Sequence, residues 1–277
     1  MTAALRTELR KVASTRAWWL TAAAMFGYMI MMGVIMAFSL VLGMRAAEEA
    51  GTAGGGPGGF GEAVLDERAI AMSVYTLGLA LGYVFPAILG AFSVTGEFRH
   101  RTITPTLLAE PRRSLVLGAK LVAVVPFALA VAVAGVLGTV LGGAATLAIM
   151  GEPSLLGDAE VQRAIALSVV ALTLWALVGV GFGSVLTNQV AAIVVLLAFT
   201  QFVEPLLRLL LAQFDATESL SKLLPGAAGE AIAGSSLYVS SGLAELLDAW
   251  QGALVLIGYA VVLVLVGRLT TFRRDIG

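Results

Sequence analysis

The chain has 277 residues, of which 59% are hydrophobic and only 13% are charged, and its mean hydropathy is +0.95. Ordinary soluble domains are about 45–50% apolar and about 25% charged, so this composition excludes a soluble globular enzyme and indicates an integral membrane protein. The net charge of −1 lacks the basic field of a nucleic-acid-binding protein, and the absence of cysteine excludes disulfides and thiolate metal sites.

Residues 2–16 are the first predicted element, an amphipathic interfacial helix on the inner leaflet. Leu5, Leu9 and Val12 recur at helical spacing on one face, and the charged residues, Glu8 included, are expected on the opposite face. Two tryptophans follow at the expected boundary between water and lipid. The alternative is a basic tail that only fixes the orientation of the chain.

Six apolar stretches are long enough to cross about 30 Å of hydrocarbon, which takes about 20 helical residues. The third is longer than a span needs, so it is expected to begin in the cytoplasm around Lys120, to tilt, or to bend at Pro126. The sequence therefore predicts an all-α integral membrane protein with one transmembrane domain over residues 1–277. The six stretches lie at about 18–43, 69–94, 115–150, 164–186, 190–211 and 249–269.

Charge predicts the orientation of these spans. The N-terminal segment, the loop 95–114 with Lys120, and the C-terminus hold 12 of the 17 basic residues but only four of the 18 acids. Because short cytoplasmic segments are rich in lysine and arginine, these three segments are expected inside. Six spans then place both termini in the cytoplasm and make the chain a multi-pass protein of the cytoplasmic (inner) cell membrane.

The segments expected outside differ in character. Residues 45–68 are rich in glycine and acids, which is typical of a flexible, solvated loop rather than a cation site. Residues 212–248 are half apolar and contain a Leu-Leu-Pro-Gly sequence at 223–226. Two interpretations stay open for this segment: short re-entrant helices that dip into the outer leaflet, or a simple outer loop.

The loop 95–114 is the most informative polar segment. A short helix is predicted from about Thr102 to Leu108, with Ile103, Leu107 and Leu108 forming a small apolar face, and Pro111 ends it. A short charged helix with an apolar face suits docking in a partner's groove. The alternative is a connector whose basic residues only set the topology.

The order of residues through this loop resembles the signature of ATP-binding-cassette (ABC) type-2 exporter permeases. In that family an acidic residue after the second span leads into a G-T-[IL] turn, followed by a leucine-rich stretch, a proline, an arginine and a lysine. Arg101 stands where the family commonly has glycine. The sequence 8–11 with the paired tryptophans resembles the family's elbow helix, and 223–229 resembles its outer re-entrant segment. The residues that carry the main resemblance are Glu97, Arg101, Thr102, Ile103, Leu107, Leu108, Pro111, Arg113 and Lys120.

This resemblance implies a permease subunit that forms half of a pathway with a second copy or a paralogue. Each half would sit on a separate ATP-binding-cassette subunit, which would hold ATP and Mg²⁺, so this chain is expected to bind no cofactor. The segment 102–108 would be the coupling helix, and a hydrophobic or amphipathic compound such as a drug or peptide antibiotic would be exported. The coupling residues expected from the resemblance are Glu97, Arg99, Arg101, Thr102, Leu107, Leu108, Pro111 and Arg113.

The sequence lacks the motifs of ATP hydrolysis and of zinc catalysis. The sequence contains no G-x-x-x-x-G-K-[ST] motif, so any ATP hydrolysis is expected on another polypeptide. His100 is the only histidine, which excludes an H-E-x-x-H zinc site. We therefore expect the chain not to be an enzyme and to hold no metal.

Two charges interrupt the fifth apolar stretch. Glu204 and Arg208 are spaced i, i+4, so they are predicted to pair on one helix face. Charges within a membrane span are functional candidates, which makes an outer gate one interpretation. The other is a local salt bridge at the rim.

Small residues predict where helices pack closely. Three G-x-x-x-G pairs occur, at 78/82, 138/142 and 179/183, and such pairs allow close helix approach in lipid.

Two other functions stay open beside an ABC permease. A transporter without an ATPase is expected to show internal repeats and ionisable residues at the membrane midplane. A membrane scaffold or assembly factor is expected to tolerate mutation of Glu97.

Overall fold

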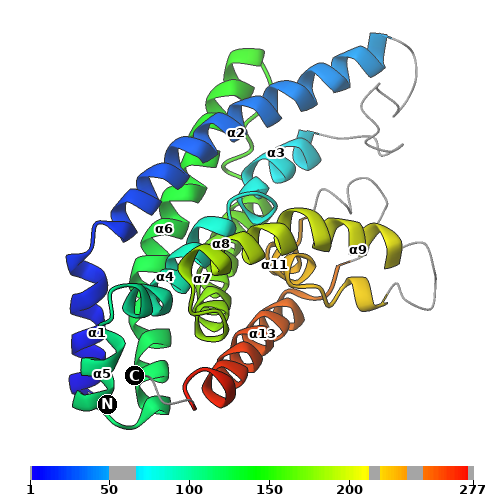
Figure 1. Ribbon diagram of the computed structural model, residues 1–277. Helices are drawn as coiled ribbons and strands as arrows, with labels where there is room; N and C mark the ends of the chain where they lie inside the picture. The colour runs from blue at the N-terminus through cyan, green and yellow to red at the C-terminus, as the bar shows by residue number, and fades with distance from the viewer. Residues whose placement is uncertain (1, 50–66, 212–218, 236–245, 274–277) are drawn as a thin grey trace.

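The computed structural model describes residues 2–49, 67–211, 219–235 and 246–273, and these ranges contain helices and no strands (Figure 1). The glycine-rich part of the first predicted outer loop lies outside them, as do parts of the segment 212–248. Within the described ranges five helices are long and apolar enough to cross a membrane, which confirms an all-helical, membrane-embedded protein. These helices are α2 (Ala17–Glu49), α6 (Arg113–Met150), α7 (Ala159–Val185), the continuous segment Gln189–Leu211 and α13 (Ala249–Thr270).

The predicted stretch 69–94 is not one helix. It is divided into α3 (Glu67–Tyr75), a 3₁₀ turn η1 (Leu77–Leu79) and α4 (Val84–Arg99). Pro86 is one cause, because it donates no amide hydrogen bond and its ring crowds the carbonyl four residues earlier, at Gly82. The expectation of a single continuous helix over this stretch is therefore wrong.

The segment Gln189–Leu211 changes its helix type midway. It consists of α8 (Gln189–Ala198), a π-helical turn η2 (Phe199–Val203) and α9 (Glu204–Leu211). Pro205 lies two residues after the end of the turn, and irregularities in a helix usually occur at prolines and π-bulges. The hydroxyl of Tyr83, the residue just before α4, donates to the carbonyl of Thr200 at 2.9 Å, which ties the π turn to the start of α4.

Close backbone contacts join the long helices in pairs. Helix α6 runs beside α2 (Figure 1), and a Cβ added at Gly142 would lie 2.4 Å from the carbonyl oxygen of Ile30 on α2. A Cβ added at Gly179 on α7 would lie 2.0 Å from the carbonyl oxygen of Ala87 on α4. Only glycine fits at such separations, so the G-x-x-x-G pairs at 138/142 and 179/183 do mark helix contacts.

Gly90 on α4 offers a test of this packing. A Cβ there would lie 1.9 Å from the carbonyl oxygen of Ala176, which belongs to the backbone of α7. We expect Gly90→Ala to lower the free energy of unfolding by about 1–3 kcal/mol, because α4 and α7 must move apart. The measurement is unfolding in mild detergent.

Gly96→Ala is the matched control for this substitution. Gly96 lies on the same helix, and nothing comes within 4 Å of a Cβ built there. Since alanine has the higher helix propensity, this variant is expected to be neutral or more stable by up to about 1 kcal/mol. Equal losses in both variants would show that α4 tolerates no alanine for reasons other than contact with α7.

Side-chain caps begin two of the membrane-length helical segments. Asp158 accepts hydrogen bonds from the amides of Glu160 and Val161 at the start of α7, and these bonds lower the pKa of its carboxyl group. Arg68 on α3 pairs with Asp158 at 2.7 Å. At the start of α8, Asn188 accepts hydrogen bonds from the amides of Val190 and Ala191, at 3.0 and 3.1 Å, which caps this helix just after the short turn that follows α7.

Candidate functional site

Two acids and two lysines meet at the end of the bundle where α1 (Thr2–Ser14) and α5 (Ile103–Ala109) lie (Figure 1). We call them the Lys120 cluster; its members are Glu8, Lys11, Glu97 and Lys120. Lys120 Nζ lies 2.6 Å from Glu8 Oε2 and 2.8 Å from Glu97 Oε1. Lys11 Nζ lies 2.6 Å from Glu8 Oε1 and 2.5 Å from Glu97 Oε1. Each lysine thus contacts both carboxylates, and the cluster joins α1, α4 and α6.

The Lys120 cluster is largely buried. The side chain of Lys120 is only 1% exposed, and it also donates to the carbonyl of Ser93 at 3.0 Å. Glu97 Oε2 is buried without a hydrogen-bond partner among the described residues. A charge removed from water is stable only when it is paired, so buried Lys120 depends on both carboxylates.

The position of Glu8 corrects the sequence prediction for the first helix. Glu8 was expected on the polar face, but it is buried against α6. At about 100° per residue, Glu8 lies about 60° from Leu5 and therefore borders the apolar face instead of opposing it. That face, with Leu5, Leu9 and Val12, is partly buried, and α1 packs along α6.

Lys11 extends the cluster to α5. Its ammonium group donates to Thr106 Oγ1 at 3.0 Å, and Thr106 lies in the middle of α5. Burial disfavours the charged form, but hydrogen bonds to Glu8 and Glu97 outweigh it and raise the pKa of Lys11 above its ordinary value. Lys11 therefore stays charged near neutral pH and holds α5 against α1 and α4.

Helix α5 lies close to its predicted position. Arg101 precedes it with a φ of 55°, a left-handed conformation that favours glycine. The amide of Thr102 donates to the carbonyl of Glu97 at 2.8 Å, which closes the turn. The chain becomes extended at Glu110, immediately before Pro111, as the steric demands of proline require.

The apolar side chains of α5 do not form one face. Ile103 is buried and Leu107 is partly buried against the core, whereas Leu108 is 78% exposed. Leu108 is about 140° from Ile103 around the helix, so the two cannot point the same way. The expectation that Leu108 shares this face is wrong, and Leu108 projects away from the bundle.

The other predicted coupling residues lie around α5 but outside the Lys120 cluster. Arg99 donates to Gln189 Oε1 at 3.2 Å, which links the end of α4 to the start of α8. Arg113 donates to the carbonyl of Phe272 beyond α13. Arg101, Thr102 and Pro111 are exposed.

A second buried set of charges lies where α9 meets α11 (Pro225–Ala233). We call it the Arg208 cluster; its members are Glu204, Arg208 and Glu230. Arg208 lies 2.8 Å from Glu204 Oε1 and 2.9 Å from Glu230 Oε2. The predicted i, i+4 pair is thus present, and Glu204 is only 1% exposed.

Glu204 also holds the first turn of α11. Its Oε1 accepts hydrogen bonds from the amides of Gly226 at 2.5 Å and Ala227 at 3.2 Å. A carboxylate at this position satisfies amides that have no partner within the helix and interacts favourably with the helix dipole. A Cβ at Gly226 would lie 2.5 Å from Glu204 Oε1, so glycine permits this approach.

Several contacts within the two clusters, and the involvement of Lys11 and Glu230, were not predicted from the sequence. The pairing of Glu8 with Lys120, the role of Lys11 and the contribution of Glu230 depend on contacts between segments 22 to 112 residues apart. One signal was available for two of them. Lys120 and Glu230 are isolated charges in apolar or small-residue stretches, and such charges usually have a buried partner.

The described residues contain no group of three or more His, Asp or Glu side chains placed to hold a metal ion. The ion pairs of the two clusters join helices that lie far apart in the sequence. No protein-family model matches the chain, and the curated proteins include no match to it.

Proposed function

We propose that this chain is the membrane-spanning permease subunit of an ABC-type exporter. It would act as a dimer with a second copy or a paralogue, driven by separate ATP-binding-cassette subunits that hold ATP and Mg²⁺. The Lys120 cluster is the observation that carries the proposal, because it joins α1, α4, α5 and α6 through buried ion pairs and one hydrogen bond. In an exporter of this type α1 is the elbow helix and α5 the coupling helix.

The proposal assigns six membrane crossings. Helices α3 and α4 with the turn η1 make the second crossing together, which places α5 and both termini in the cytoplasm. The excess of basic residues near α1, α5 and the end of α13 supports this orientation. Helix α11, all nine residues of which are buried, is the outer re-entrant segment.

In this mechanism ATP-driven closure of the partner subunits pushes on α5. The Lys120 cluster transmits this movement. A hydrogen bond links Lys11 to Thr106 on α5, and Lys11 shares its carboxylate partners with Lys120. The Arg208 cluster, which fixes α11 to α9, serves as the outer gate. The cargo is a hydrophobic or amphipathic compound that is exported.

Leu108 gives the most direct test of the partner. It is a large apolar residue of α5 that is exposed, so Leu108→Asp changes the surface offered to the partner without breaking a core contact. We expect the tagged wild-type chain, purified in mild detergent from its own cells, to carry an ATPase subunit with a G-x-x-x-x-G-K-[ST] motif. We expect Leu108→Asp to reduce the amount of this subunit at least about tenfold, the loss typical of an interface hot spot.

Leu156→Asp is the matched control, since Leu156 is another partly exposed leucine and lies between α6 and α7. It should leave the amount of ATPase subunit unchanged. Absence of such a subunit from the wild-type preparation would overturn the proposed function. An equal amount with both variants would place the contact away from α5.

A further inference from the structure

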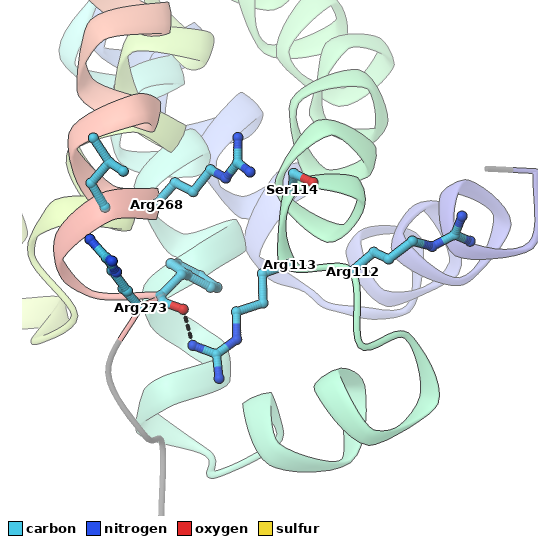
Figure 2. A pocket seen from close by; sticks show the side chains of 7 residues that line it. Arg112, Arg113, Ser114, Arg268 and Arg273 are labelled. Carbon is cyan, nitrogen blue, oxygen red and sulfur yellow. Dashed lines mark hydrogen bonds between the residues drawn. The ribbon is translucent and has the colours of Figure 1, made fainter.

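A pocket of about 580 Å³ opens between the start of α6 and the end of α13. Figure 2 shows the side chains that border it, which come from two segments more than 150 residues apart. Four of its seven lining residues are arginines and none is acidic. The full lining is Arg112, Arg113, Ser114, Arg268, Leu269, Phe272 and Arg273.

The four arginines are not equivalent. Arg112 points away from the others and pairs with Glu110 at 2.8 Å (Figure 2). Arg113 donates to the carbonyl of Phe272, which joins the two walls of the pocket. The side chains of Arg268 and Arg273 make no ion pair or hydrogen bond with the described part of the chain. Two guanidinium groups therefore border the pocket without a partner among the residues that the structure describes.

The pocket offers donors suited to a phosphate group. Figure 2 shows Arg268 reaching from α13 toward Ser114 on the first turn of α6. A guanidinium group binds phosphate oxygens through two parallel N–H bonds, and the serine hydroxyl is a further donor. The start of a long helix adds a partial positive charge on the same side. A neutral or cationic ligand would find no acceptor side chain there except the hydroxyl.

The surroundings of the pocket favour a lipid over a free anion. Leu269 lines it and is 62% exposed, and Leu265, one turn earlier on α13, is also exposed. This places an apolar strip directly beside the guanidinium groups, as a phospholipid with its headgroup at the end of a membrane helix requires. A free phosphate would gain nothing from that strip.

We infer that the pocket between α6 and α13 binds the phosphate headgroup of an anionic phospholipid, with Arg268 and Arg273 as ligands and an acyl chain along Leu269. The site lies at the end of the bundle that the proposed orientation places at the inner leaflet. The binding itself does not depend on an ATPase partner, so it is tested separately from the proposed function.

Native mass spectrometry of the detergent-purified chain can test the site with phosphatidylglycerol and phosphatidylcholine as probes. We expect the wild-type chain to retain phosphatidylglycerol in preference to phosphatidylcholine. Arg268→Gln is expected to reduce that retention roughly fivefold, the contribution of one basic residue at an anionic lipid surface. Arg10→Gln, which removes an exposed arginine of α1 outside the pocket, is the matched control and should leave retention unchanged.

Three results would overturn the inference. Equal loss of phosphatidylglycerol in Arg268→Gln and Arg10→Gln would mean general attraction between basic residues and anionic lipid. Equal retention of the two lipids by the wild-type chain would mean that the pocket does not select an anionic headgroup. Displacement of phosphatidylglycerol by inorganic phosphate at equimolar concentration would mean a site for free phosphate.

Discussion

Lys120→Met is expected to lower the free energy of unfolding by about 3–5 kcal/mol, the cost of removing one partner from a buried ion pair. The substitution keeps most of the side-chain volume but removes the charge that both Glu8 and Glu97 contact. Lys11 alone then faces two buried carboxylates, and one of them remains uncompensated. Thermal unfolding in mild detergent, followed by tryptophan fluorescence, measures the loss.

A double variant separates lost charge pairing from lost packing. In Glu8→Gln/Lys120→Met the remaining charges are Lys11 and Glu97, whose atoms lie 2.5 Å apart, so the cluster is again neutral. The double variant should therefore be more stable than Lys120→Met alone, and the two effects should not add. Arg10→Met, on the exposed face of α1, should change stability by less than about 0.5 kcal/mol. Strict additivity in the double variant would contradict the network.

Arg208→Met is expected to have a loss of similar size, about 3–5 kcal/mol, at the Arg208 cluster. The substitution leaves two buried carboxylates, from Glu204 and Glu230, without the guanidinium group that pairs with both. Their repulsion acts between α9 and α11, so α11 should separate before the rest of the protein unfolds. The thermal midpoint measures the loss of stability, and protease sensitivity near α11 measures its early separation.

Neutralising one acid should reverse part of this loss. Arg208→Met/Glu230→Gln removes the repulsion and leaves Glu204 on the amides of Gly226 and Ala227, so it should be more stable than Arg208→Met. Arg163→Met is the control, since Arg163 is exposed on α7. If Arg163→Met lowered the midpoint as much as Arg208→Met, the loss would not come from the Arg208 cluster.

The sequence predicts the long helices well because their signal is local. About 20 successive apolar residues form a helix in lipid whatever their neighbours do, since backbone groups must be satisfied within the segment. The departures from this rule occur near prolines. Pro86 follows the break between α3 and α4, and Pro205 follows the π turn. Hydropathy averages over such residues and therefore predicts continuous spans.

The candidate site was predictable only in part. The sequence of the loop singled out Glu97, and the spacing of Glu204 and Arg208 predicted their pair. Partners such as Glu8 and Glu230 come from segments whose approach depends on the packing of whole helices. Ideal helical geometry already places Glu8 about 60° from Leu5, so the wrong prediction came from assigning every charged residue of this helix to the polar face.

Helix α6 has a mechanical consequence that follows from its length. Its 38 residues, at about 1.5 Å each, span roughly 57 Å, with the Lys120 cluster near one end. If a helix of this length tilts by about 10° about the end that carries the cluster, its opposite end moves by roughly 10 Å. Because the backbone of α2 packs closely against Gly138 and Gly142 of α6, we expect the two helices to tilt together. If α5 moves as the proposed function requires, the resulting tilt would carry the far end of α6 through about the width of a helix.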